Sequence, residues 1–64
     1  MYKRERTCKC IEDLVSDDLQ FHKGREYQVD VYLLHYKVYQ NGGYDDYIII
    51  NDEDEFSKYF KLIE

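Results

Sequence analysis

The chain has 64 residues, a net charge of −5 and no proline or tryptophan, and eight of its aromatic residues are tyrosines. A chain of this length forms one domain at most and buries only about 60% of the surface that its unfolded form exposes. Tyrosine favours strands, because its ring fits a half-buried pleated surface while its hydroxyl stays hydrated. We therefore expect a single, mainly β domain over residues 1–64, with residues 1–4 frayed.

The negative charge is concentrated in one part of the sequence. Residues 45–55 contain six acids and no base, which leaves nine bases and eight acids elsewhere. An acidic surface repels a phosphate backbone, so direct binding to nucleic acid is disfavoured. The N-terminus, with Lys3, Arg4, Arg6 and Lys9, is the exception, and we interpret it as a solvated edge.

Residues 5–11 alternate as in a first strand, which places Cys8 and Cys10 on one face. Two side chains that point the same way cannot bridge to each other. The sequence also lacks an apolar leader and a run of 18 apolar residues. These features predict a soluble protein of a reducing compartment, by default the cytosol, with no membrane contact.

The middle of the chain predicts a loop, a turn and a long strand. Residues 12–19 lack a pattern and indicate an irregular loop, and Gly24 suits a tight turn. From Tyr27 the apolar residues alternate, but at residues 31–34 the alternation changes phase. Since the side-chain period of a strand is two, this phase change requires a bulge, a bend or a break into two strands.

Asn41 and Gly42 predict a two-residue hairpin turn, because both tolerate the positive φ that a type I′ turn needs. That turn fixes a register in which one face carries Leu34, Tyr36, Val38, Tyr47 and Ile49. The expected pairs are Tyr39 with Tyr44, Lys37 with Asp46, Tyr36 with Tyr47, and Leu34 with Ile49.

Four consecutive acids, residues 52–55, precede an aromatic stripe of Phe56, Tyr59 and Phe60 at helical spacing. Asn51 or Asp52 can cap a helix of one or two turns, and early acids suit its positive end. Residues 61–64 can then form a last strand.

This order of elements predicts a small SH3-like barrel of about five strands, with a single helical turn before the last strand. Its residues resemble small proteins encoded by phages and prophages of Gram-positive bacteria. The resemblance lies in four motifs: Cys10-Ile11; Phe21, Gly24, Tyr27 and Val29; residues 47–52; and Tyr59, Phe60 and Ile63. It implies a mobile-element protein that acts on a host or competitor component, and it supplies no catalytic residue.

The sequence contains no glycine-rich phosphate loop, nucleophile elbow or His-Glu-x-x-His motif, so we expect a non-enzyme without a cofactor. Cys8, Cys10, His22 and His35 are the residue types of a two-cysteine, two-histidine zinc site, but their spacing matches no known zinc knuckle. Two small buried thiols and two ordinary histidines are the favoured interpretation. Residues 52–55 run consecutively and so do not match a calcium loop.

The predicted function is inhibition or modulation of a host or defence protein, including an immunity enzyme, through an acidic, tyrosine-rich surface. Clustered carboxylates can imitate phosphate spacing and steer association with a basic patch. The predicted partner-binding residues are Asp45, Asp46, Asp52, Glu53, Asp54, Tyr39 and Tyr44. The alternative is an oligomeric sponge for a nucleotide-like ligand, or a structural subunit, that self-associates through Tyr32, Tyr39 and Tyr44.

Overall fold

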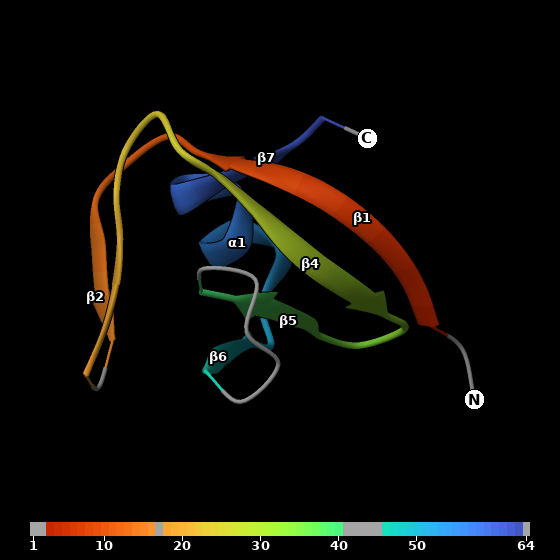
Figure 1. Cartoon of the computed structure of the whole chain (residues 1–64). Coiled ribbons are helices and arrows are strands. Elements are labelled where there is room, and N and C mark those ends of the chain that lie inside the picture. Colours follow the sequence, from red (N-terminus) through yellow and green to blue (C-terminus); the bar gives the residue numbers. More distant parts are fainter. Residues whose placement is uncertain (1–2, 17, 41–45, 64) are drawn as a thin grey trace.

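The computed structural model describes residues 3–16, 18–40 and 46–63. Within these ranges the elements are β1 (Lys3–Cys10), β2 (Leu14–Ser16), β3 (Leu19–Phe21), β4 (Glu26–Tyr32), β5 (Tyr36–Tyr39), β6 (Tyr47–Ile50), α1 (Glu53–Tyr59) and β7 (Phe60–Leu62). The strands form a five-stranded antiparallel sheet, in the order β6-β5-β4-β1-β7, and a separate β2-β3 sheet (Figure 1). The mainly β fold is confirmed. Across the described ranges the pairings leave the sheets open.

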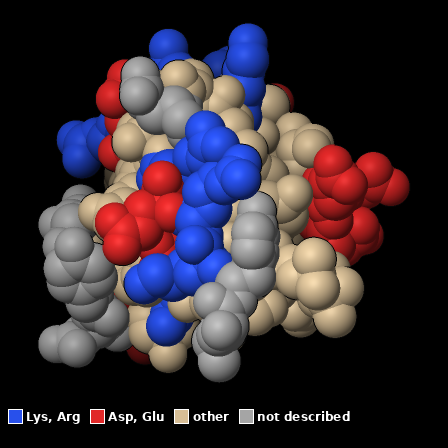
Figure 2. All heavy atoms as spheres, turned by 90° about the vertical axis from the view of Figure 1, so that its right-hand side faces the viewer, with Lys and Arg blue, Asp and Glu red and all other residues tan. Residues whose placement is uncertain are grey.

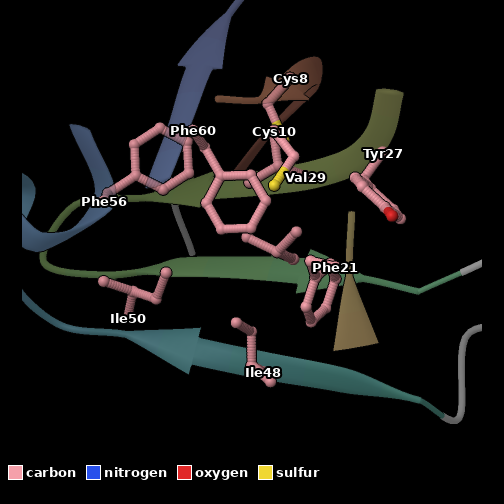
Figure 3. Packing of buried hydrophobic residues seen from close by; sticks show 10 residues of the cluster. Cys8, Cys10, Phe21, Tyr27, Val29, Ile48, Ile50, Phe56 and Phe60 are labelled. Carbon is pink, nitrogen blue, oxygen red and sulfur yellow. The ribbon is translucent and has the colours of Figure 1, made fainter. Parts of the chain in front are cut away.

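The core lies on one face of the five-stranded sheet. Alternate side chains of each strand point to this face, where α1 and β3 add aromatic rings (Figure 3). The core residues are Cys8, Cys10, Phe21, Tyr27, Val29, Val38, Ile48, Ile50, Phe56 and Phe60. The burial of Cys8 and Cys10 on a shared face is as predicted.

Aromatic rings join the separate elements across this core. The rings of Phe21, Tyr27 and Phe60 meet edge to face, with centroids 5.0 to 6.4 Å apart. Phe56 of α1 stacks on Tyr36 of β5 at 4.0 Å. Edge-to-face and offset stacked pairs stabilise by about 0.5–1.5 kcal/mol beyond the area that they bury. The helix and the β2-β3 hairpin are therefore held to the sheet by different rings.

The predicted glycine turn is confirmed, whereas the irregular loop over residues 12–19 was wrong. Gly24 has a φ of 92°, a left-handed conformation that favours glycine, and its N–H donates to the Cys10 carbonyl at 2.8 Å. Residues 14–16 and 19–21 form the antiparallel strands β2 and β3. Strands of three residues are too short to show an alternation in the sequence.

The phase change at residues 31–34 is a break between two strands. β4 ends at Tyr32, its residue Val31 pairs with Tyr36 of β5, and the Tyr32 N–H donates to the His35 carbonyl at 2.9 Å. The chain thus reverses over Leu33 and Leu34. This turn places the odd-numbered residue Val31 opposite the even-numbered residue Tyr36. The inward-facing positions are therefore odd-numbered in β4 and even-numbered in β5, which explains the phase change in the sequence.

The predicted register of the next hairpin was wrong. Tyr39 pairs with Tyr47, and Tyr36 pairs with Ile50. This three-residue shift reverses the faces of β6, so Ile48 and Ile50 are buried while Tyr47 and Ile49 are exposed. Burying two isoleucines outweighed the tidier charge pairs of the predicted register. The turn predicted at Asn41 and Gly42 lies outside the described residues.

The first and last strands of the chain are neighbours in the sheet. β1 begins at Lys3, and Lys3 and Arg4 are paired with Tyr32 and Val31 of β4. α1 follows β6 as predicted, and β7 then pairs antiparallel with β1, with Phe60 opposite Cys10. The last strand thus starts one residue earlier than expected and ends within the described range.

Candidate functional site

The structure divides the acidic residues 45–55 into two groups. Asp46 is exposed just before β6, and residues 52–55 are exposed just after it. Five residues of nearly extended chain lie between Asp46 and Asp52, and the six steps correspond to roughly 20 Å at about 3.3 Å per residue. Asp45 and Tyr44 lie outside the described residues. Asp46 and the acids of residues 52–55 therefore lie at opposite ends of β6.

The acidic turn, residues 52–55, begins α1. Asp52 is the N-cap, and its Oδ1 accepts a hydrogen bond from the Asp54 N–H at 3.0 Å, as the sequence predicted. The three following acids are Glu53, Asp54 and Glu55, all exposed. They lie near the positive end of the helix dipole, where negative charge is stabilising. The helix buries Phe56 on its other side. The helix α1 therefore anchors itself to the core through Phe56 and carries exposed carboxylates in its first turn.

Tyr39 lies outside the core cluster, as expected, but it is only 5% exposed. Its hydroxyl donates to Oδ2 of the buried Asp30 at 2.7 Å. Burial and this hydrogen bond to Asp30 both raise the pKa of the Tyr39 phenol. Its ring is not presented to a partner in this arrangement, so the exposed part of the predicted site among the described residues consists of Asp46 and the acidic turn.

Asp30 is the centre of a polar cluster that the sequence analysis missed. It is 3% exposed, and Lys3 Nζ lies 3.9 Å from its Oδ2. Among the described residues its other oxygen, Oδ1, has no hydrogen-bond partner. Lys37, which pairs with Asp30 across the strands, instead places its Nζ 4.1 Å from the centroid of the Tyr47 ring. The signal in the sequence was an acid between Val29 and Val31, on the polar side of a strand.

Leu33 and Leu34, the leucine turn, form a second exposed feature. They are 78% and 79% exposed, the highest values among the large apolar side chains of the described residues. Tyr32 and His35 stack beside them with centroids 4.3 Å apart. A shallow concavity joins this turn to Asn51 and Glu53, so it adjoins the start of α1. The sequence showed the phase change here but did not indicate the exposure.

The surface carries basic and acidic side chains on the same face. Figure 2 shows lysine and arginine atoms in a band through the middle of one face, with one group of acidic atoms directly beside the band and another at the edge of the face. β1 contributes Arg4, Glu5, Arg6 and Thr7 to an open groove that Gln28 also lines. Lys3 and Glu5 of the same strand form an ion pair at 3.8 Å, so part of the basic charge is balanced locally.

The cysteines and histidines do not come together. Cys8 and Cys10 are buried free thiols; burial raises the pKa of Cys8 to about 12 and also raises that of Cys10. His22 is exposed, and His35 stacks on Tyr32. Over residues 3–16, 18–40 and 46–63 no three histidine, cysteine or acidic side chains are grouped as metal ligands would be. In the same ranges α1 is too short to span a membrane.

Comparisons of the chain with protein-family models, with curated proteins and with solved structures gave no match.

Proposed function

We propose that this chain is a non-enzymatic protein that binds a basic surface on another protein and thereby inhibits or modulates it. The observation that carries the proposal is the acidic turn: four consecutive, exposed carboxylates held at one end of a short helix. Adjacent carboxylates of this kind attract a basic patch over long range and raise the rate of association.

The local structure of the acidic turn supports this role. Only Asp52 has a structural hydrogen bond among the side-chain contacts described for residues 52–55, through its cap to Asp54. The side chains of Glu53, Asp54 and Glu55 make no hydrogen bond among the contacts described, so the cap alone does not account for them. The ion pairs of the described residues, Lys3–Glu5 and Lys3–Asp30, do not include residues 52–55. The charge is thus available to a partner.

The setting of the proposal comes from the resemblance to small phage and prophage proteins. In that setting the partner is a host or defence protein with a basic, nucleic-acid-handling surface, in the bacterial cytoplasm. We further propose that the order of strands, helix and final strand belongs to an SH3-like fold, which would serve as a small support for the acidic turn.

The test compares two variants that each lose three charges. The first carries Glu53→Gln, Asp54→Asn and Glu55→Gln and retains Asp52, so that the cap persists. The matched control carries Glu12→Gln, Asp18→Asn and Glu26→Gln, at exposed acids outside the acidic turn. Tagged forms of the wild type and of both variants are used to capture proteins from a Gram-positive bacterial lysate.

The expected result is a host protein that is captured by the wild type and the control but not by the α1 variant. Capture should also weaken as salt is raised, because exposed charges are screened. Equal capture by the two variants, with both folded, would refute the acidic turn as the binding surface.

A further inference from the structure

We infer that the leucine turn, Leu33 and Leu34, is the apolar anchor of the same binding surface, and that the partner carries an apolar pocket bordered by lysine or arginine. This inference rests on the proposed function, because it takes the acidic turn as the charged rim of the interface. It adds the apolar contact that the charges alone do not provide.

The leucine turn has no visible structural role. Two-residue hairpin turns favour asparagine, aspartate and glycine, whose backbones adopt positive φ with little strain. Two leucines at such a turn remove that advantage, and at 78% and 79% exposure they contribute little to the core. By contrast, the described turn before β4 has a glycine, Gly24, at its left-handed position, with a φ of 92°. A position that breaks a local rule without a structural gain is a candidate functional position.

The residues around the leucine turn are of the kinds found around the apolar centre of a protein interface. The stacked rings of Tyr32 and His35 lie beside it, and both are half-buried, so the turn has a firm base. Asn51 and Glu53 share a shallow concavity with it. Protein interfaces commonly combine a central apolar anchor with a polar or charged rim. Here the anchor would be the two leucines, and the rim would be the acidic turn.

The acidic residues beside the leucine turn distinguish between three possible partners: a second copy of the chain, an anionic membrane and a protein with a basic surface. In a symmetric contact with a second copy, acids beside each leucine turn would approach acids of the other copy, which is unfavourable. An anionic membrane would repel the same carboxylates. A protein surface with basic residues around an apolar pocket is complementary in both respects.

The test replaces the turn with one that should fold at least as well. The variant Leu33→Asn, Leu34→Gly introduces the residues preferred in a type I′ turn while removing both exposed side chains. The matched control is Val15→Asn, which removes an apolar side chain that is 68% exposed on the β2-β3 hairpin. Thermal unfolding of each variant checks that its fold is retained.

The probe is a 14-residue helical peptide of leucine and lysine, with the leucines along one side and lysines on both flanks. A second peptide, in which serine replaces leucine, carries the same charge without the apolar side. Binding is followed by ¹⁵N–¹H NMR spectra of the protein. The expected shifts fall together on residues 32–36 and 51–55 for the leucine peptide. The leucine-turn variant should bind it at least tenfold more weakly, whereas Val15→Asn should bind as the wild type does.

The outcomes distinguish this inference from the proposed function. If the acid variant of α1 loses binding while the leucine-turn variant does not, the acidic surface stands and the apolar anchor is refuted. If both variants bind as the wild type does, both ideas fail. If the serine peptide binds as well as the leucine peptide, charge alone explains recognition and the anchor is again refuted.

Two further measurements would overturn the choice of partner. Binding to neutral phosphatidylcholine vesicles that is lost in the leucine-turn variant would assign the leucines to a membrane. A dimer in sedimentation velocity that dissociates in the same variant would assign them to self-association. The expected result is neither vesicle binding nor dimer formation.

Discussion

One face of the five-stranded sheet buries aliphatic and aromatic side chains and two thiols, whereas the other face buries a carboxylate and a phenol. On the core face, Val29 and Val38 are opposite each other and fully buried. On the outer face the neighbouring pair is Asp30 and Lys37. The contrast shows that burial here depends on two kinds of interaction, ring and methyl packing on one side and a specific hydrogen bond on the other.

The largest expected effect belongs to the core face. Phe60→Ala should lower the free energy of unfolding by about 3–5 kcal/mol, because it removes a ring that contacts Phe21, Tyr27 and Phe56. The free energy of unfolding of a domain of this size is about 3–10 kcal/mol in total, so a large part of the Phe60→Ala protein should be unfolded. Denaturant unfolding followed by circular dichroism measures the change.

A control for that prediction is available in the same strand and on the same face. Leu62 lies opposite Cys8 but is 42% exposed, so Leu62→Ala should have a much smaller effect than Phe60→Ala. Similar losses for the two variants would show that β7 pairing, and not the aromatic core, dominates the stability.

The outer face can be tested through the Asp30–Tyr39 hydrogen bond. Tyr39→Phe leaves the buried carboxylate without its hydroxyl donor and should lower the free energy of unfolding by about 1–3 kcal/mol. The double change Asp30→Val, Tyr39→Phe removes both polar partners, and much of the lost stability should return. Chemical denaturation of the two single variants and of the double variant measures this coupling.

Residues that interact should give a double variant whose loss is smaller than the sum of the two single losses. The prediction would be contradicted if the double variant lost as much stability as the Asp30→Val and Tyr39→Phe variants lose together. In that case the burial of Asp30 would be tolerated for another reason, such as its ion pair with Lys3 at 3.9 Å. The variant Lys3→Gln distinguishes the two contacts. Its effect should be small, since the Lys3 side chain is 44% exposed.

Each face of the sheet carries a buried group with a raised pKa, Cys8 on the core face and Tyr39 on the outer face, so we expect the protein to lose stability at alkaline pH. Burial raises the pKa of Cys8 from 9.0 to about 12, so the folded state keeps this proton to a higher pH than the unfolded state does. The associated stability is fully present below pH 9 and is lost as the pH rises toward 12; by pH 10 the loss is roughly 1 kcal/mol. The raised pKa of Tyr39 acts in the same direction at higher pH.

Thermal unfolding between pH 7 and pH 11 measures this dependence. Cys8→Ala should be less stable at neutral pH but should show a weaker decline between pH 9 and pH 10, when each protein is compared with its own value at pH 8. An identical decline would exclude Cys8 as the source and leave Tyr39 or exposed groups. The wild-type thiols should also react slowly with a thiol reagent until the protein unfolds.

The sequence predicted those features that depend on neighbouring residues and missed those that depend on distant pairing. The Gly24 turn, the cap at Asp52 and the shared face of the two cysteines follow from local chemistry, and the structure confirms them. The β6 register failed because its faces are decided by the burial of Ile48 and Ile50 in a core assembled from several strands.

The candidate site shows the same division. Exposed acids at residues 52–55 could be predicted from their spacing and the helical stripe after them. The burial of Tyr39 could not, because it depends on Asp30 in another strand. The exposure of Leu33 and Leu34 could not either, because a run of four apolar residues is equally compatible with a buried bend. Only the pairing of Val31 with Tyr36 locates these leucines at a turn.

The smallest expected effect separates the two roles of the acidic turn, which lies at the edge of the core face. Asp52→Ala removes the cap and should lower the free energy of unfolding by about 1 kcal/mol, whereas Asp52→Asn keeps a side-chain acceptor for the Asp54 N–H and should lower it by only a few tenths. Urea unfolding of the two variants measures the difference.

The same two variants should behave alike toward a basic partner, because each removes one exposed charge. If the cap matters only for folding, the Asp52→Ala and Asp52→Asn variants should differ in stability but bind the partner equally well. If asparagine were to bind like the wild type while alanine did not, the partner would depend on the conformation of the first helical turn and not on the Asp52 charge. The remaining acids, Glu53, Asp54 and Glu55, would then carry the electrostatic attraction on a helix end whose geometry Asp52 maintains.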